Sequence, residues 1–440
     1  IVLTAGNPGT TSRLRTAAEL AFERDVNLPR RLSMLSEQRD RLTAFSRLGP
    51  DEHRIASAAL QSALNSLKAL SGRRQALADA SGFARIIARE ADLQARVRRN
   101  LASRREVGDA WGEVARAQSI YRGFHWAHQL LEARAGERSE LFGWARDIVR
   151  GGAERAQPDA ERIPRFTEAR LASVVQGLRA ERPIEPAFEE MHLGFWLATM
   201  RAQLAELPAT RRVLGDESPE ALAARLSQSR LADPAYRMRL WEGGAGAVAA
   251  SEDPMIVFVR AWDADARALR ARFIAEVEGP VARAQERIAR ARFRAFGESQ
   301  YPDATFSPRV SYGRVEGWTE PSGAIGAFTR LRGLYERAAG ASPALLSQRW
   351  MEARARLDPE TIFNLSSSND IISGNSGSPL LDREGRVVGV AFDGNIHSLG
   401  GEYFYDGALN RNVTVAATLI RAALAHVYDM PALVAELEGE

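Results

Sequence analysis

The chain has 440 residues, of which 45% are hydrophobic, and its 59 Lys and Arg against 56 Asp and Glu give a net charge of +3. These values describe a globular protein of about two or three domains, and the interspersed charges make a nucleic-acid partner a weak interpretation. The absence of cysteine excludes disulfides, thiolate catalysis and cysteine-ligated metals, and no apolar run approaches the roughly 18 residues of a membrane span. We expect a protein with neither a membrane-spanning segment nor a cofactor.

The first two thirds of the chain are predicted to be almost entirely helical. Residues 1–5 are β-branched and apolar and predict a strand, and Gly6-Asn7-Pro8-Gly9 predicts the turn that follows. From Ser12 or Arg13 to about Phe296, apolar residues recur at helical spacing among Ala, Arg, Glu and Gln. We expect helix breaks at Gly49-Pro50, Gly151-Gly152, Pro158 to Pro164, Arg182-Pro183 and Gly243-Gly244.

Strands are predicted again after Gly297. Aromatic and β-branched residues favour strands in 301–312 and 315–318, whereas a helical pattern covers 324–357, with interruptions near Gly340 and Pro343. Residues 379–381 and 386–392, joined by Asp382-Arg383-Glu384-Gly385, are typical of a β-hairpin. An apolar helix at 414–427 and a short helix at 431–437 are predicted to close the chain.

These patterns predict an α+β protein in which a large all-helical domain is inserted between β segments. Residues 1–11 form the end of a strand and its turn, 12–296 the helical domain, and 297–440 the β portion with the final helix. The chain opens on what resembles an interior strand, without an initiator methionine or a leader. We therefore expect a fragment that lacks its N-terminal portion.

The clearest chemical signature is a loop of small residues, Asn369-Asp370-Ile371-Ile372-Ser373-Gly374-Asn375-Ser376-Gly377-Ser378-Pro379, which leads into a strand. It resembles the nucleophile loop of chymotrypsin-fold peptidases. In such a loop, glycines on both sides of the serine allow a tight turn and leave backbone N–H groups facing a developing oxyanion. Ser376 is the predicted nucleophile, and the amides of Gly374 and Ser376 are the predicted oxyanion donors. The alternative, a plain hairpin loop, is disfavoured by the strand, turn and strand that follow.

A serine nucleophile of this type also needs a histidine and an acid, which in chymotrypsin-type order both precede it. The histidines of this chain lie in helical contexts or after the serine: His53, His125, His128, His192, His397 and His426. We expect the missing partners to belong to an absent N-terminal β-barrel and the chain to be inactive alone. A degenerate, non-catalytic peptidase is the alternative.

Several separated motifs occur along the whole chain: Gly6 to Gly9 with Arg13, Leu64 to Ala69, Leu240 to Gly244 with Asp253 to Met255, Ile288 to Arg292, Tyr301 to Phe306, Gly374 to Pro379 and Phe392 to Asn395. Together they resemble the bacterial dipeptidyl-peptidase 7 and 11 family of serine exopeptidases. The resemblance implies a helical domain inserted into a chymotrypsin-type double β-barrel, a periplasmic or secreted location, and a catalytic histidine and aspartate upstream of the first motif. The chain departs from related members at Val415-Ala416-Ala417, where they often have a Val-His-Ser type sequence.

The resemblance also implies residues that bind substrate. Asp393 matches the aspartate that holds the substrate α-ammonium group, although an ordinary Asp-Gly turn has the same sequence. Gly394 matches a position where members that prefer acidic residues have arginine, so it implies cleavage after apolar residues such as Leu, Met or Phe. Asn65, one helical turn before Lys68, either donates to the bound peptide backbone or holds a helix–helix contact.

Asp370 lies before the serine at the position where trypsin-like enzymes keep a carboxylate for arginine or lysine side chains. We favour a structural role instead, in which it bonds local backbone amides. The predicted function is a serine-type dipeptidyl-peptidase that releases N-terminal dipeptides from oligopeptides through an acyl-enzyme on Ser376. A trypsin-fold endopeptidase and a non-catalytic helical interaction protein with a peptidase remnant are the alternatives. The expected partners are oligopeptides with free N-termini, with a homodimer left open.

Overall fold

The computed structural model describes residues 2–6, 9–341 and 346–439. The chain divides into two compact units, which we name the β unit (Ile1–Arg24, Lys68–Arg96 and Arg292–Glu440) and the helical unit (Asp25–Leu67 and Val97–Ala291). The predicted domain boundaries at residues 12 and 296 lie where the secondary structure changes. The boundaries between the two compact units lie elsewhere, after Arg24, Leu67, Arg96 and Ala291. Residues 68–96 belong to the β unit although they are helical.

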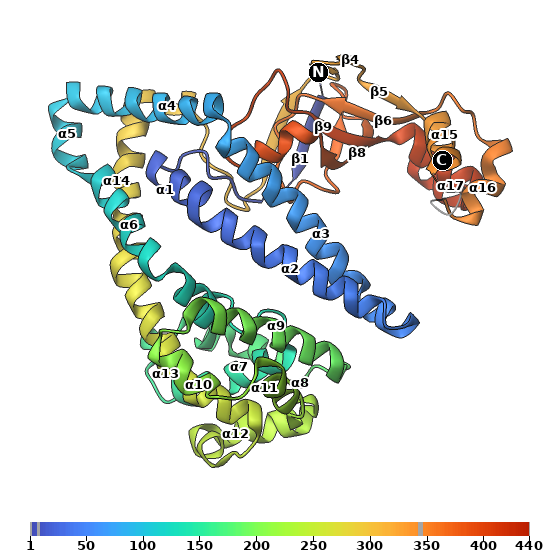
Figure 1. Cartoon of the computed structure of the whole chain (residues 1–440). Helices are drawn as coiled ribbons and strands as arrows, with labels where there is room; N and C mark the ends of the chain where they lie inside the picture. Colours follow the sequence, from blue (N-terminus) through green and yellow to red (C-terminus); the bar gives the residue numbers. More distant parts are fainter. Residues whose placement is uncertain (1, 7–8, 342–345, 440) are drawn as a thin grey trace. The chain divides into compact units, whose positions relative to one another are not determined.

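The helices of the first two thirds of the chain follow one another with short connections (Figure 1). They are α1 (Ala17–Phe22), α2 (Leu28–Ser46), α3 (Pro50–Ala78), α4 (Ala80–Arg99), α5 (Leu101–Val107), α6 (Ala110–His128), α7 (Glu140–Glu154), α8 (Glu168–Arg179), α9 (Pro186–Leu204), α10 (Pro208–Leu214), α11 (Pro219–Ser227), α12 (Pro234–Ala250), α13 (Pro254–Phe273) and α14 (Gly279–Phe296). π-helical turns lie at Glu23–Asn27, Gln129–Ala133 and Ile274–Glu278. The predicted helical stretch is confirmed.

The first helix begins later than predicted, at Ala17 rather than near Ser12 or Arg13. Thr16 caps it, and Thr16 and Glu19 form a reciprocal capping box. The residues just before it are held in a non-helical conformation by long-range hydrogen bonds, which local sequence patterns do not report. Further along, α9 to α13 each have proline at the start of the first turn, where its missing N–H is not needed.

The core of the helical unit is built around aromatic side chains. Trp196 and Trp262 are fully buried, and the Phe142 ring lies between them, with centroids 4.8 and 5.3 Å away. The predicted helix break at Gly151-Gly152 is wrong, because both residues lie inside α7. A Cβ at Gly151 would come within 2.2 Å of the Trp241 ring on α12, so glycine there permits close helix packing rather than ending the helix.

The β unit contains a seven-stranded antiparallel sheet in the order β2-β1-β7-β8-β9-β6-β5. Its strands are β1 (Val2–Gly6), β2 (Arg309–Gly313), β5 (Phe328–Arg330), β6 (Ile362–Ser367), β7 (Pro379–Leu381), β8 (Val387–Gly394) and β9 (Asn412–Ala416). A separate pair consists of β3 (Trp318–Glu320) and β4 (Gly323–Ile325). The predicted hairpin at 379–392 is confirmed as β7 and β8. The mixture of helices with an antiparallel sheet confirms the α+β class.

Two predicted helices are partly wrong. The stretch from 324 begins with β4 and β5, and its helices are α15 (Leu331–Ala341) and α16 (Gln348–Ala353); Pro343 lies outside the described residues. The closing helix α17 covers Ala417–His426, because residues 412–416 are instead strand β9. Val413 and Val415 alternate with buried residues there, and pairing with β6 and β8 on both sides outweighs the local helical pattern. The short final helix α18 (Pro431–Glu438) is confirmed.

The predicted chymotrypsin-type barrel is not established by this sheet, which the strand pairing leaves open between β2 and β5. The chain just after β2 does reach the end of β6. Val315 and Ser367 form an isolated bridge, and the Ser368 amide donates to the Arg314 carbonyl at 2.9 Å. The sheet is therefore curled. The chain after edge strand β2 contacts the end of β6, which is next to the other edge strand, β5.

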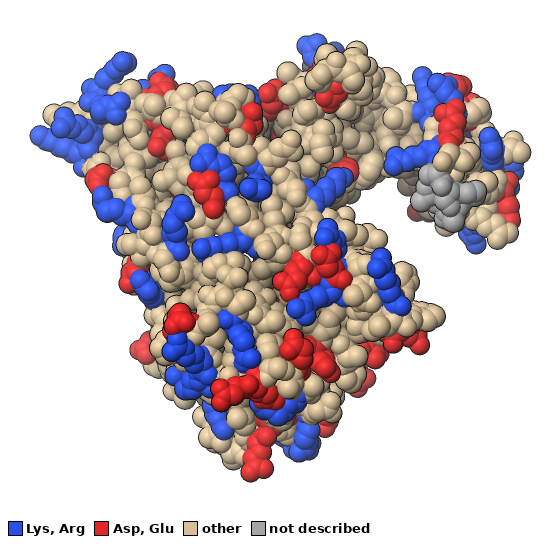
Figure 2. Space-filling view, in the orientation of Figure 1, with Lys and Arg blue, Asp and Glu red and all other residues tan. Residues whose placement is uncertain are grey.

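Charged side chains are distributed as the composition predicts. On the face in view, Figure 2 shows basic and acidic side chains intermixed, with no single basic stripe. Many of them form local ion pairs along helices, such as Arg41 with Glu37. Among the described residues, no helix is long and apolar enough to cross a bilayer.

Candidate active site

The predicted nucleophile loop connects β6 to β7 in the β unit. Gly374 and Gly377 both have positive φ, 103° and 90°, a region that residues with a side chain rarely adopt. Asn375 and Ser378 are buried and anchor the loop, whereas Ser376 is exposed. The glycines therefore do what the sequence suggested, in that they turn the chain tightly on either side of an exposed serine.

The backbone amides of the loop alternate between used and unused donors. The Asn375 amide donates to the Ile372 carbonyl at 3.1 Å, and the Gly377 amide donates to the Ala391 carbonyl at 2.8 Å. The amides of Gly374 and Ser376 donate to no residue in the described ranges. Backbone N–H groups without a protein acceptor near an exposed hydroxyl are one requirement for oxyanion stabilisation.

The Ser376 hydroxyl is not activated in this structure. Its Oγ donates to the Phe392 carbonyl at 3.2 Å, and no histidine of the described ranges is hydrogen-bonded to it. His397 instead contacts Glu320 at 2.7 Å, and His192 is buried in the helical unit against the Phe188 ring. The structure therefore identifies no general base for Ser376.

The N-terminal segment packs closely against the loop at two points, Ser373 and Ser378. A Cβ at Gly6 would lie 2.0 Å from the Ser378 Oγ, and a Cβ at Gly9 would lie 2.3 Å from the Ser373 carbonyl oxygen. The Gly9 amide donates to that same carbonyl at 2.5 Å. Both glycines of the predicted turn are therefore needed for close approach to the loop, while Asn7 and Pro8 lie outside the described residues.

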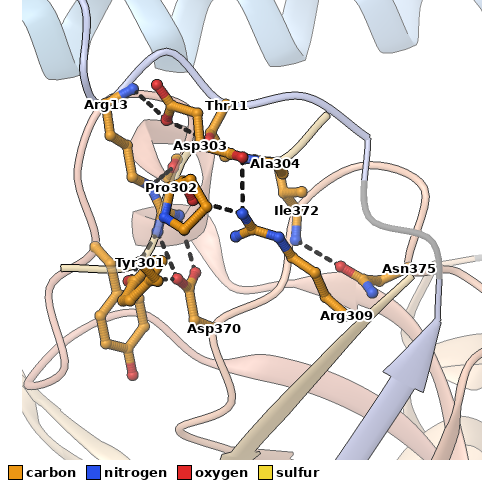
Figure 3. Close-up of polar contacts among 12 residues, drawn as sticks. Thr11, Arg13, Tyr301, Pro302, Asp303, Ala304, Arg309, Asp370, Ile372 and Asn375 are labelled. Atoms are coloured by element: carbon orange, nitrogen blue, oxygen red, sulfur yellow. Dashed lines mark hydrogen bonds and ion pairs between the residues drawn. The ribbon is translucent and has the colours of Figure 1, made fainter. Parts of the chain in front are cut away.

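Arg13 connects the same segment to the start of the loop (Figure 3). Both of its terminal nitrogens contact the Asp370 carboxylate, one of them at 2.9 Å, and its Nε donates to the Gly401 carbonyl at 2.8 Å. The Tyr301 hydroxyl donates to Asp370 at 3.0 Å, and burial together with that carboxylate raises the pKa of Tyr301. Burial alone would lower the pKa of Arg13, but the bonds to Asp370 outweigh it and raise that pKa.

Asp303 accepts hydrogen bonds from the segment that contains Arg13 (Figure 3). Its carboxylate accepts hydrogen bonds from the amides of Arg13 and Leu14, each at 2.9 Å, and from the Thr11 hydroxyl at 2.5 Å. These bonds explain why residues 11–14 are not helical. A cavity of about 620 Å³ lies beside this cluster, but Ser376 is not among the residues that line it.

Asp370 has a structural contact, though not the predicted one. Its partners are the Arg13 guanidinium and the Tyr301 hydroxyl, whereas the sequence suggested local backbone amides. Because both carboxylate oxygens already contact Arg13, Asp370 is not available to bind a substrate arginine or lysine. This contact removes the main sequence argument for trypsin-like specificity.

A smaller cavity, of about 240 Å³, lies beside Ser376. Ser376, Asp393 and Gly394 all line it, so three of the predicted site residues share one cavity. The Asp393 side chain is exposed, and its Oδ1 accepts a hydrogen bond from the Gly394 amide at 2.8 Å. We name this the Ser376 cavity.

Sequence reasoning missed part of this cavity. Ala69 and Arg73 of α3, together with Phe392 and Leu399, also line it. Ala69 and Phe392 belong to motifs already noted in the sequence, whereas Arg73 and Leu399 do not. For these two the signal was Gly72, an unfavourable residue inside a helix, whose Cβ would lie 2.5 Å from the Leu399 side chain. Asn65 is an exposed residue of the same helix, but it belongs to the helical unit, and its role stays a prediction.

No group of three or more His, Asp or Glu side chains that could hold a metal ion occurs within the described ranges.

Comparisons with known proteins cover this chain to different extents. The family model for peptidase S46 matches residues 1–439. An Asp/Glu-specific dipeptidyl-peptidase of Shewanella putrefaciens is 25% identical, with 99% of this chain and 64% of that protein covered. A dipeptidyl-peptidase 7 of Porphyromonas gingivalis is 30% identical over 44% of this chain and 28% of its own length.

Among solved structures, that of Porphyromonas endodontalis DPP11 in complex with the dipeptide Arg-Glu matches with a TM-score of 0.77 at 18% identity. The match covers 99% of this chain and 64% of that one, and it shows a shared fold. This chain therefore spans somewhat less than two thirds of the length of these relatives. By the match of its family model from end to end, the chain belongs to the peptidase S46 family.

Proposed function

We propose that this chain carries the nucleophile and substrate-binding residues of a serine-type dipeptidyl-peptidase. The observation that carries the proposal is the geometry of the loop around Ser376. The amides of Gly374 and Ser376, which have no acceptor among the described residues, lie next to an exposed hydroxyl at a cavity that Asp393 also lines. Membership of peptidase S46 and the named activities of its relatives support the same conclusion.

In the proposed reaction, the Ser376 Oγ attacks the carbonyl carbon of the second residue of a peptide. Its proton passes to a general base, and the oxyanion that forms accepts hydrogen bonds from the Gly374 and Ser376 amides. The scissile C–N bond then breaks, the leaving amine takes up a proton, and an ester on Ser376 remains. Water hydrolyses this acyl-enzyme, which releases a dipeptide and restores the hydroxyl.

Asp393 explains why an enzyme with this site would remove dipeptides rather than cut internally. A carboxylate in the same cavity as the nucleophile can bind the free α-ammonium group by charge-assisted hydrogen bonds. This contact fixes the number of residues between the N-terminus and the scissile bond. The exposed Asp393 carboxylate forms no ion pair within the described ranges, so it is available for such a ligand.

We propose further that cleavage follows apolar residues. Gly394 contributes no charge to the Ser376 cavity, and burying an unpaired substrate carboxylate there would cost several kcal/mol. An apolar side chain gains free energy by leaving water. This preference differs from that named for the Shewanella putrefaciens relative and is therefore a sharp test of the site.

Two further features belong to the proposal. The bridge between Val315 and Ser367 supports a barrel of the chymotrypsin type, because it joins the chain after edge strand β2 to β6, which is next to the other edge strand, β5. We place the enzyme outside the cytoplasm, in the periplasm or secreted, where it would shorten peptides that are taken up as nutrients.

The proposal is tested by labelling the full-length gene product with a fluorophosphonate, which reacts with activated serines. We expect a covalent adduct on the tryptic peptide that contains Ser376, identified by mass spectrometry, and no adduct in Ser376→Ala. Exclusive labelling of another serine would contradict the assignment. Ser373→Ala, which changes the neighbouring exposed serine of the same loop, is the matched control and should still be labelled at Ser376.

A further inference from the structure

A cation reaches the Ser376 cavity from helix α3. Ala69 and Arg73 are four residues apart, hence on one face of the helix, and both line the cavity. This face packs closely on the chain after β8, because a Cβ at Gly72 would lie 2.5 Å from Leu399 and one at Gly400 would lie 2.9 Å from the Ala76 Cβ. All these residues belong to the β unit. The backbone that carries Arg73 is therefore fixed beside the cavity.

Glu402 forms an ion pair with Arg73 and balances its charge. Its Nη2 lies 3.0 Å from Oε2 of Glu402, and the two side chains are 28% and 11% exposed. The other carboxylate oxygen of Glu402 accepts a hydrogen bond from the Ser12 hydroxyl at 3.0 Å. Among the described residues, Glu402 is the one ion-pair partner of Arg73, and Arg73 is itself among the residues that line the cavity.

We propose that Glu402 is a specificity-determining residue, which keeps the Ser376 cavity selective against acidic substrate residues by balancing the charge of Arg73. The inference rests on the proposed function and deepens it. A substrate carboxylate in the cavity meets an arginine whose charge is already compensated by Glu402. Without the Glu402 charge, the same arginine becomes a counter-ion for that carboxylate.

The inference separates two sources of charge selectivity. Because residue 394 is glycine, it places no charged side chain in the cavity. The cavity is nevertheless lined by one cationic residue, Arg73. The net charge of the Arg73 and Glu402 pair then decides between neutral and acidic side chains. A single change that does not touch Gly394 should therefore shift the preference.

The test compares two dipeptidyl substrates that differ only in Glu or Gln next to the scissile bond, because these side chains have nearly the same shape and differ in charge. In the full-length gene product, Glu402→Gln should raise the ratio of kcat/KM for Glu over Gln by about tenfold, the effect of about 1.4 kcal/mol. The amide oxygen that this substitution introduces can still accept from the Ser12 hydroxyl, so the local fold is retained.

Arg73→Gln and the double variant Arg73→Gln with Glu402→Gln provide the controls. Arg73→Gln alone should lower the Glu over Gln ratio below that of the wild type, because the Glu402 charge is then unbalanced. The double variant should lose the gain seen in Glu402→Gln. If Glu402→Gln does not fold, a ratio unchanged in Arg73→Gln overturns the inference by itself.

The outcomes also separate this inference from the proposed function. An enzyme that loses activity in Ser376→Ala but keeps the wild-type ratio in both Glu402→Gln and Arg73→Gln would overturn the inference alone. Activity that is unaffected by Ser376→Ala would overturn the proposed function.

Discussion

Arg13 and Asp370 are 357 positions apart in the sequence, yet both terminal nitrogens of the arginine contact the carboxylate. The two side chains are only 10% and 24% exposed. This pair joins the segment after β1 to the start of the loop that carries Ser376, so the position of the serine depends on residues from opposite ends of the chain.

Removal of one member of this pair should destabilise the β unit. Asp370→Asn leaves the buried Arg13 charge without its counter-ion, and we expect a loss of about 3 kcal/mol in the free energy of unfolding. Urea unfolding monitored in the β unit measures it. Asp92→Asn, which breaks the exposed pair of Asp92 with Arg96 in the same unit, is the control and should cost less than about 1 kcal/mol. Equal losses in the two variants would show that the Arg13 contact is not stabilising.

The stability of the helical unit should fall at mildly acidic pH. Burial, reinforced by the charge of Arg138, lowers the pKa of His192 from its ordinary 6.5 to about 4. Between these values the unfolded chain binds a proton that the folded chain does not. The stability contribution is therefore present above pH 6.5 and decreases as the pH falls toward 4, by up to about 3 kcal/mol.

His192→Leu removes this titration while keeping the site apolar. The free energy of unfolding of the helical unit, measured from pH 7.5 to 4.5, should fall less steeply in the variant than in the wild type. His53→Gln, which removes an exposed imidazole from α3, is the matched control. Identical slopes in the wild type and His192→Leu would contradict the prediction.

Asp393→Asn should impair binding of the substrate amine without impairing folding. The amide oxygen can still accept from the Gly394 amide, but the counter-charge for the α-ammonium group is lost. We expect kcat/KM on free-amine dipeptidyl substrates to fall by roughly 10- to 100-fold, the loss of one or more charge-assisted hydrogen bonds. An unchanged kcat/KM with unchanged thermal stability would remove Asp393 from the site.

Introducing arginine at Gly394 should favour acidic substrate residues, but the structure shows that the single change is not enough. A Cβ at position 394 would lie 2.6 Å from the Ser398 Cβ and 3.5 Å from the Arg411 carbonyl oxygen. We therefore pair Gly394→Arg with Ser398→Gly and use Ser398→Gly alone as the control. Cleavage after Glu should increase relative to cleavage after Leu only in the double variant. A wild-type enzyme that already prefers Glu would refute the proposed apolar preference.

Local patterns in the sequence were sufficient for much of the fold. Helical spacing predicted the stretch that the structure shows from Ala17 to Phe296, and turn residues predicted the hairpin of β7 and β8. They failed where tertiary contacts override local preference. Gly151 lies inside a helix because the Trp241 ring packs against it, and residues 412–416 form a strand because β6 and β8 pair with them on both sides.

The candidate site divides in the same way. The nucleophile loop could be predicted because glycine and serine are required locally, by the turn and by the chemistry. The contacts that support it could not, because the Arg13 contact with Asp370 and the Arg73 contact with Glu402 join residues hundreds of positions apart. Arg13 belonged to a motif noted in the sequence, but its partner did not follow from it, and Arg73 did not stand out among the many arginines of the chain.

The central claim is that Ser376 removes dipeptides from free N-termini. The most direct measurement incubates the full-length gene product, and its Ser376→Ala variant, with one peptide in two forms, one with a free and one with an acetylated N-terminus, and identifies the products by mass spectrometry. The account predicts a dipeptide and a peptide shortened by two residues from the free form alone, and neither product with Ser376→Ala. Equal cleavage of the acetylated form, or cleavage that persists in Ser376→Ala, would contradict it.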